Sequence, residues 1–385
     1  MANPEKTTAD AASNEGGNST VWTLALATAL IGLVALPRRT TVQHSGETSP
    51  NGPAREPSPS HTGEDAKRVA DAQPERGRKA TTPSEIPAKG WKDIGMRVFK
   101  DISENRLVSV AAGVTFYVLL AIFPAIAALV SCYGLVADAA TINEQIASLQ
   151  GILPSGALEI VGEQVKRITE KGDTTLGITF FTSIALSLWS ANGGMKAVFD
   201  ALNVVYEEKE TRNFFWLNLR SLAFTAGALL FVVFALVAIV VLPAIFAFVG
   251  LSEKAWYIAL LRWPVLLAAV LGGLALLYRY GPSRDAPRWR WVTWGSAVAG
   301  VLWLVASLAF SWYVSNFGSY NETYGSLGAA VGFMTWIWLS TTIVLVGAEI
   351  NAEMEHQTEA DTTVGKPLPL GTRSARMADT VGAAT

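Results

Sequence analysis

Cysteine and histidine are almost missing from this sequence of 385 residues, which contains one cysteine and three histidines. The single cysteine, Cys132, excludes an intramolecular disulfide. His44, His61 and His356 all lie outside the long apolar runs, so no histidine-based metal site can form inside a membrane. We therefore expect no metal site and no bound cofactor.

Familiar catalytic motifs are missing as well. The sequence contains no GxxxxGK[ST] phosphate loop, no HExxH metalloprotease motif and no GxSxG nucleophile elbow. The formal net charge is -2, so the chain lacks the excess of basic residues that is typical of nucleic-acid-binding proteins. These observations predict a protein that is not an enzyme and does not bind nucleic acid.

Apolar residues are abundant instead: 50% of the chain is hydrophobic and only 16% is charged. Residues 324–348 form an uncharged run that ends at the carboxylate of Glu349. A bilayer core of ~30 Å needs roughly 20 helical residues to cross it. This composition predicts an integral membrane protein.

Six such runs predict the fold class, an all-α polytopic integral membrane protein built as a six-helix bundle. A shorter apolar run covers residues 21–36 and stops at Pro37. It is either a further short transmembrane helix or part of a non-native N-terminal extension, and we favour the helix. The expected spans are 107–136, 176–201, 222–250, 256–280, 292–314 and 327–351.

The polar parts of the chain complete the expected domain organisation. Residues 1–20 form a polar N-terminus, and residues 37–89, rich in Pro, Gly, Ser and Thr, are expected to be a disordered linker. Residues 90–356 form the six-helix membrane domain, and 357–385 are expected to be a disordered C-terminal tail.

Two segments show amphipathic helical spacing. Residues 91–106 carry Trp91, Ile94, Val98 and Ile102 near one face, which predicts a helix lying on the membrane surface. Residues 140–171 repeat such spacing on both sides of Pro154, which predicts a pair of helices capping the membrane domain.

The distribution of lysine and arginine predicts the orientation. Basic residues are concentrated before the first span, after the second and fourth spans, and after the last one, whereas the loop at 315–326 has none. Both ends of the six-helix core are therefore expected to face the cytoplasm, in a bacterial plasma membrane.

Polar residues near the inner ends of the spans are the best sequence pointer to a functional site. We expect Lys196 to pair with Asp200, and Glu349 to pair with Arg279 or Arg220. A structural lock between helix ends is the favoured interpretation, and a substrate or proton site is the alternative. The whole candidate cluster is Trp189, Ser190, Asn192, Lys196, Asp200, Arg220, Arg279 and Glu349.

Small and aromatic residues mark two further features. Glycines at helical spacing predict close helix packing, and tyrosines with an asparagine predict a polar rim on the outer side, which would normally only anchor the protein. The packing glycines are Gly193, Gly194, Gly325, Gly328 and Gly332, and the rim residues are Tyr320, Asn321 and Tyr324.

Four motifs together resemble the YihY/virulence factor BrkB family of bacterial inner-membrane proteins. They are LVSVAAGVTFYVLLAIFPAIAALV from 107, LWSANGGMKAVFDALNVVYEEKETRNF from 188, LLYRYGPSRDAPRWRWVTWGSAVAG from 276, and YNETYGSLGAAVGFMTWIWLSTTIVLVGAEINAE from 320. The resemblance covers residues 90–356 and implies a six-helix membrane protein without a settled activity. Some members once carried the name ribonuclease BN, which is regarded as mistaken.

A transporter or lipid-translocating protein is the favoured function, with helices bent at Pro124 and Pro243. The alternative is a scaffold that transports nothing and holds envelope partners. Expected partners are the lipid bilayer and either a second copy of the chain or an envelope protein.

Overall fold

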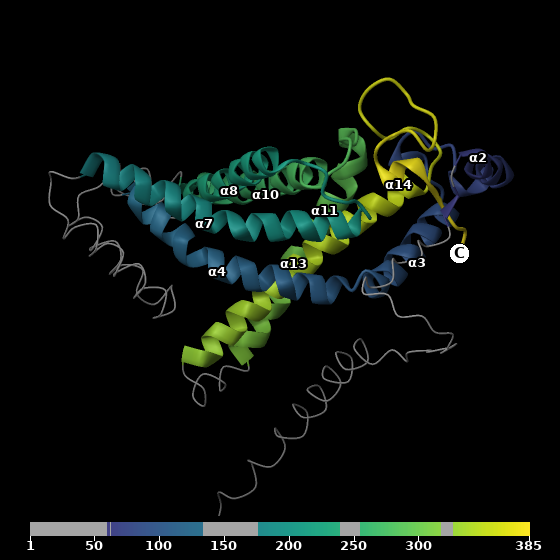
Figure 1. Cartoon of the computed structure of the whole chain (residues 1–385). Coiled ribbons are helices and arrows are strands. Elements are labelled where there is room, and N and C mark those ends of the chain that lie inside the picture. The colour runs from purple at the N-terminus through teal and green to yellow at the C-terminus, as the bar shows by residue number, and fades with distance from the viewer. Residues whose placement is uncertain (1–59, 62, 134–175, 239–254, 317–325) are drawn as a thin grey trace, which may run out of the picture. The chain divides into compact units, whose positions relative to one another are not determined.

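The computed structural model describes residues 60–61, 63–133, 176–238, 255–316 and 326–385 (Figure 1). All of them belong to one compact unit, Pro57–Thr385. The expected helices at 21–36 and 140–171 lie outside the described residues, as do Pro243, Gly325 and the rim of Tyr320, Asn321 and Tyr324.

In the described part of the chain, each of the six expected spans overlaps one long helix, so the chain is an all-α polytopic membrane protein. Within the described residues, five of these helices contain stretches long and apolar enough to cross a membrane: Leu107–Ile126, Phe214–Ala235, Trp263–Tyr280, Trp289–Val314 and Ala330–His356. The six helices are α4 (Leu107–Tyr133), α7 (Leu176–Val205), α8 (Phe214–Leu236), α10 (Ala255–Tyr280), α11 (Trp289–Asn316) and α13 (Ser326–His356).

Local sequence explains where α8 begins. The Asn213 side chain accepts a hydrogen bond of 2.9 Å from the backbone nitrogen of Trp216, which caps the helix start. The helix therefore begins at Phe214, eight residues before the hydropathy signal that placed its start at 222. The cap, and not the hydropathy of the sequence, sets the first residue of this helix, because the backbone N–H groups of the first turn need hydrogen-bond acceptors.

The long helices pack as a series of neighbours. Helices α4 and α7 lie side by side over most of their length (Figure 1), and α13 packs between α4 and α11. Helix α8 packs on α7, and α10 packs on α11, while the described parts of α8 and α10 make sparse contact. The shared core includes Leu107, Leu202, Tyr278, Val292 and Leu345.

Glycine permits a close approach between helices α11 and α13. A Cβ atom on Gly295 would lie 2.5 Å from the Asn351 side chain and would also clash with the backbone oxygen of Gly347. A Cβ on Gly347 would lie 2.6 Å from both the Ala299 methyl group and the Tyr278 hydroxyl. The two backbones therefore meet only because both positions lack a side chain.

The predicted amphipathic helix is α3 (Ala88–Glu104). Its Ile94 and Val98 are buried, as predicted for the apolar face, but Asp93 and Arg97 are buried beside them. Helix α3 packs on α13, so its inner face covers protein as well as any membrane surface. This differs from the expected surface helix, because hydropathy alone does not show that the end of α13 offers carboxylates to Arg97.

Two segments expected to be disordered are folded where the structure describes them. The N-terminal one contains β1 (Ser60–His61), α2 (Gly63–Ala72) and the 3-10 helices η1 (Pro74–Arg76) and η2 (Pro83–Glu85). The C-terminal one contains α14 (Arg376–Asp379) and β2 (Val381–Gly382). Strand β1 pairs with β2 in an antiparallel two-stranded ribbon.

Mutual hydrogen bonds explain this order. The Gln357 amide donates to the backbone oxygen of Arg76 at 2.8 Å, and the Thr358 hydroxyl lies 2.7 Å from that of Ala80. Each segment alone is too polar to bury a core, but together they satisfy each other's backbone groups. The expectation of disorder is therefore wrong for residues 63–89 and 357–385.

Candidate functional site

Three buried carboxylates meet where α3 packs on the C-terminal end of α13. Asp101 comes from α3, and Glu349 and Glu353 lie one helical turn apart on α13. One oxygen from each carboxylate lies within 4.8 Å of one from each of the others. Glu349 is 0% exposed and Glu353 is 1% exposed, whereas Asp101 is partly covered. We call these three residues the acidic triad.

Glu353 is the member of the acidic triad that contacts basic side chains. Arg97 donates from Nε to its carboxylate, and His356 Nδ1 lies 3.3 Å from its other oxygen. The Arg97 guanidinium also donates to Gln357 Oε1 at 2.7 Å. These contacts hold Arg97 in place and offset the charge of one carboxylate of the triad.

Glu349 has no comparable partner. Asn105 approaches it, but neither carboxylate oxygen of Glu349 accepts a hydrogen bond within the described part of the chain. Its expected pairing with Arg279 or Arg220 is wrong: Arg279 donates to the backbone oxygen of Pro287 at 2.6 Å, and Arg220 is exposed. Glu349, the carboxylate that the sequence analysis identified, therefore lies beside two other carboxylates and not beside an arginine.

The environment of Asp101 reflects the same crowding of negative charge. Burial, and next the charge of Glu353, raise the pKa of Asp101 to about 7. Neither Asp101 nor Glu353 was a predicted site residue. The spacing of Glu349 and Glu353, four apart on one helix, was a signal that could have identified the second carboxylate.

A second buried charge pair lies beside the acidic triad. Arg284, between α10 and α11, donates to Glu355 at 2.5 Å, and both side chains are completely buried. The Arg284 guanidinium lies over the Tyr206 ring at 4.2 Å, and Glu355 also accepts from the Thr362 hydroxyl at 2.7 Å. This pair ties the α10–α11 connection to the end of α13.

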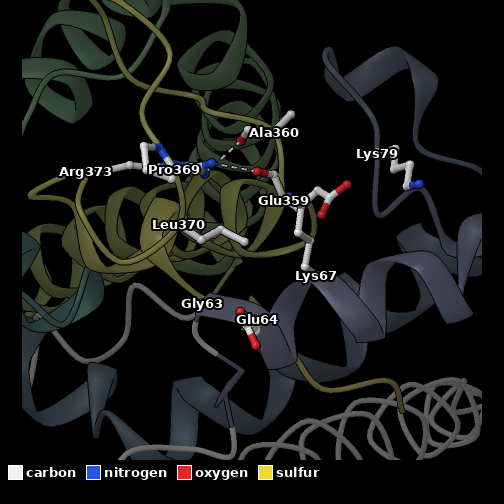
Figure 2. A pocket seen from close by; sticks show the side chains of 9 residues that line it. All are labelled: Gly63, Glu64, Lys67, Lys79, Glu359, Ala360, Pro369, Leu370 and Arg373. Atoms are coloured by element: carbon white, nitrogen blue, oxygen red, sulfur yellow. Dashed lines mark hydrogen bonds between the residues drawn. The ribbon is translucent and has the colours of Figure 1, made fainter.

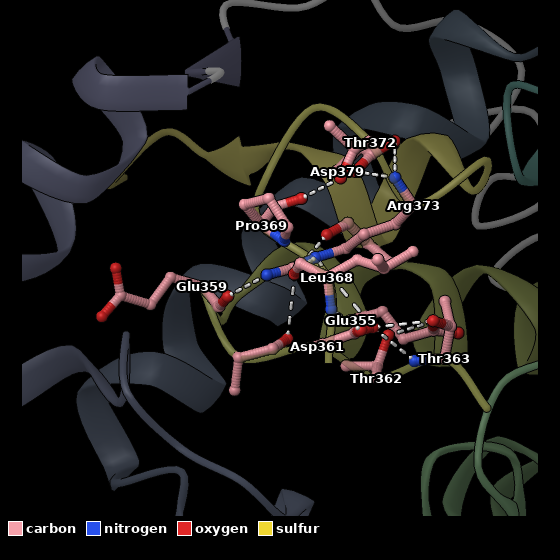
Figure 3. A network of polar contacts seen from close by, with 12 residues as sticks. Glu355, Glu359, Asp361, Thr362, Thr363, Leu368, Pro369, Thr372, Arg373 and Asp379 are labelled. Carbon is pink, nitrogen blue, oxygen red and sulfur yellow. Dashed lines mark hydrogen bonds and ion pairs between the residues drawn. The ribbon is translucent and has the colours of Figure 1, made fainter. Parts of the chain in front are cut away.

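The C-terminal segment closes over this end of α13. In Figure 3, Arg373 and Asp379 are linked to surrounding backbone groups, and Arg373 donates to the oxygens of Glu359 and Ala378 at 2.7 and 2.6 Å. Arg78, from the N-terminal segment, is fully buried and donates to the Gln357 oxygen at 3.3 Å. Both terminal segments thus contact the residues that directly follow the end of α13.

A pocket of about 510 Å³ lies between α2 and the C-terminal segment (Figure 2). It is lined by Lys67, Lys79 and Arg373 together with the carboxylates of Glu64 and Glu359. Mixed charge gives the pocket no clear preference for an anion or a cation.

Two of the predicted polar residues of α7 contact side chains outside the acidic triad. Lys196 lies over the rings of Trp189 and Phe214, at 5.4 and 5.9 Å from their centroids, and no ion pair with Asp200 is seen among the described residues. Asn192 is buried and accepts a hydrogen bond of 3.3 Å from the Thr225 hydroxyl of α8.

The predicted packing glycines divide into two kinds. A Cβ on Gly194 would touch α4, 3.1 Å from the Ala121 methyl group, as expected for a packing position. A Cβ on Gly193 or Gly332 would meet nothing within 4 Å, so these two glycines are not in close packing, while Gly328 is partly covered. The glycines that the prediction missed are Gly295 and Gly347, which permit the close approach of α11 and α13.

Comparison with known proteins gives one matching family. A profile of the family described as virulence factor BrkB matches residues 98–368. YfkH of Bacillus subtilis, a protein named as ribonuclease-like, is 29% identical over 63% of this chain and 88% of its own length. UPF0761 membrane proteins of Haemophilus influenzae and Aliivibrio salmonicida are 23% and 28% identical, over 69% and 66% of this chain and 96% and 80% of their own lengths. No solved structure matches the chain.

Proposed function

This chain belongs to the virulence factor BrkB family of multi-pass membrane proteins, and from that premise we propose that it is a transporter or lipid-translocating protein. The matched residues include all six long helices in full and therefore the described membrane core. Membership confirms the family resemblance carried by the four sequence motifs. The family name does not state an activity, so the function is argued from the helices themselves.

A polar stripe on α7 is the observation that carries the proposal. Ser190, Gly193, Lys196 and Asp200 follow one another at helical spacing, so they share one face. Ser190 and Asp200 are exposed, and a Cβ atom added at Gly193 would meet nothing within 4 Å beyond its own stretch of helix. Polar groups facing lipid tails are costly, which favours a stripe that faces water or lipid headgroups.

Helix packing next to this stripe supports the same proposal. Helix α8 packs on α7, but contact between the described parts of α8 and α10 is sparse. Gly227 on α8 and both Gly272 and Gly273 on α10 also have open space at their Cβ positions. A weakly packed border of this kind can separate to admit a headgroup while the acyl chains stay in the bilayer.

We place the protein in the bacterial plasma membrane, with both ends of the six-helix core in the cytoplasm. The concentration of lysine and arginine in the loops on one side supports this orientation. The lipid bilayer is its first partner, and a second copy of the chain or an envelope protein is a further one.

A lipid-flip assay with two matched glycine variants tests the proposal. Purified protein is reconstituted into vesicles with a headgroup-labelled phospholipid, and an external quencher reports label that reaches the outer leaflet. Gly193→Leu places bulk in the polar stripe, whereas Gly332→Leu places it on α13, and both positions have free space for the first added carbon. We expect quenching beyond the outer-leaflet fraction for wild type and Gly332→Leu, and slower quenching for Gly193→Leu.

Cysteine labelling separates a polar groove from a dry bundle. In a Cys132→Ala background, Ser190→Cys should react with a membrane-impermeant maleimide, and Leu230→Cys on the apolar face of α8 should not. Equal protection of both cysteines, together with no flip in vesicles that contain correctly inserted protein, would refute lipid translocation through this stripe. If the protein carries a small solute instead, Ser190→Cys should still react with the maleimide, but the labelled phospholipid should not flip.

A scaffold without transport is the alternative, favoured by the folded N- and C-terminal segments at one end of the bundle. It predicts a dry stripe and no flip. Ribonuclease activity, suggested by the name of the Bacillus subtilis relative, is disfavoured because Glu349 and Glu353 are buried beneath α3 and out of reach of an RNA phosphate.

A further inference from the structure

The acidic triad brings more negative charge into a buried place than its protein partners offset. Among the residues that the structure describes, Arg97 supplies the guanidinium within ion-pair distance of the triad, and it pairs with Glu353. His356 contributes a second contact to the same carboxylate. Asp101 and Glu349 therefore remain as two carboxylates without an ion-pair partner, beside a third that is already paired.

Glu349 makes the arrangement unusual for a purely structural cluster. Its side chain is 0% exposed, and neither of its oxygens has a hydrogen-bond partner among the residues that the structure describes. An unpaired buried carboxylate costs several kcal/mol, so in native proteins such a group is paired, binds a cation or takes up a proton. An exposed acidic cluster would be solvated by water, but this carboxylate is not.

The spacing of the oxygens indicates which cations fit. Two oxygens on opposite sides of a calcium ion lie roughly 4.6–5.2 Å apart, because each Ca²⁺–O distance is about 2.3–2.6 Å. The triad oxygens all lie within 4.8 Å of one another, inside that span. For Mg²⁺ the corresponding limit is about 4.2 Å, so the carboxylates would have to close by a few tenths of an ångström.

We propose that Asp101, Glu349 and Glu353 form a binding site for a hard divalent cation, Ca²⁺, Mn²⁺ or Mg²⁺, that joins α3 to the end of α13. Oxygen-only ligands select this class of ion over Zn²⁺ or Cu²⁺. Two positive charges would balance the two unpaired carboxylates, while Arg97 continues to hold Glu353. The cation would stabilise the docking of α3, and this role does not depend on the proposed transport.

The test uses the full chain in detergent after treatment with a chelator, with Mn²⁺ as the spectroscopic probe. Electron paramagnetic resonance measures free Mn²⁺ during a titration, and thermal unfolding is followed with chelator, Ca²⁺ or Mg²⁺. The variants are Glu349→Gln and Asp101→Asn. Glu104→Gln is the matched control, because this exposed glutamate lies on the same helix, close to Asp101, and loses the same charge.

We expect wild type and Glu104→Gln to bind one Mn²⁺ per chain, and the two triad variants to bind it at least tenfold more weakly. Without metal, Glu349→Gln should unfold at a higher temperature than wild type, because it removes an unpaired buried charge. With Ca²⁺ present, the wild type should unfold at a higher temperature than Glu349→Gln. If Glu349→Gln fails to fold, Asp101→Asn decides the question, because Asp101 is only partly covered.

Three results would overturn the proposal. One is folded wild-type protein that binds no Mn²⁺ in a saturable way. Another is Mn²⁺ binding of equal affinity in wild type and both triad variants, which would place the ion elsewhere. The third is acid alone stabilising the wild type with no effect of any metal, which would show that the triad is neutralised by protons.

Discussion

Removing one partner of the buried Arg284–Glu355 pair should destabilise the protein far more than removing both. The pair has 0% side-chain exposure on each side and an N–O distance of 2.5 Å. In Arg284→Met, the Glu355 carboxylate keeps the Thr362 hydroxyl as a partner but loses its cation. Losing one member of such a buried pair costs about 3–5 kcal/mol, because the other charge stays buried.

The pair also perturbs the ionisation of its arginine. Burial alone would lower the pKa of Arg284, but the adjoining Glu355 carboxylate raises it above its ordinary value. The guanidinium therefore stays charged, and Glu355→Met would leave it buried over the Tyr206 ring without its ion-pair partner. We expect Glu355→Met to cost as much as Arg284→Met.

Thermal unfolding in detergent, followed by fluorescence-detected size exclusion, measures the effect. At about 2 °C per kcal/mol for a chain of this size, each single variant should lower Tm by roughly 6–10 °C. The double variant Arg284→Met/Glu355→Met should recover most of this loss, since two apolar side chains need no partners. Arg68→Met, which removes an exposed pair of 3.7 Å with Asp65, should change Tm by about 1 °C or less.

Two results would refute this reasoning. A single variant that loses no more stability than Arg68→Met would show that burial of the pair has no energetic consequence. A double variant that loses the sum of both single effects would show that the two side chains act independently.

Two further predictions concern packing and pH. Gly295→Ala should prevent folding or lower Tm strongly, because its methyl group would overlap the backbone of Gly347, whereas Gly332→Ala should be neutral; expression and Tm of the two variants check this. Burial would raise the pKa of Glu210, but hydrogen bonds from Arg212 lower it to about 2. This depressed pKa stabilises the fold above the unfolded value of about 4.3, and the stabilisation is lost as pH falls toward 2. Glu210→Gln should therefore weaken the dependence of Tm on pH across that window, and an unchanged acid slope would contradict it.

The long helices could be predicted from the sequence because each depends on its own composition. An uncharged run such as 324–348 is long enough to form a helix and to cross a bilayer whatever surrounds it. The predicted spans therefore match α4, α7, α10, α11 and α13 closely. The start of α8 differs because the capping by Asn213 overrides the hydropathy boundary.

The candidate site was predicted only in part, for the opposite reason. Glu349 was identified because a carboxylate at the end of an apolar run is unusual in itself. Its neighbours were not, because Asp101 lies on another helix and Arg97 was assigned to a membrane surface. The favoured pairing with Arg279 failed because depth in the membrane does not define position around the bundle.

The sequence by itself determined that this protein is an all-α membrane protein of the BrkB family, because hydropathy and local motifs are properties of contiguous residues. Only the tertiary structure decided that residues 63–89 and 357–385 fold together, and that Asp101, Glu349 and Glu353 meet. Those features depend on contacts between segments that are individually too polar or too short to show them. Long-range pairing of backbone groups and charges supplies the free energy there, and no window of the sequence contains both partners.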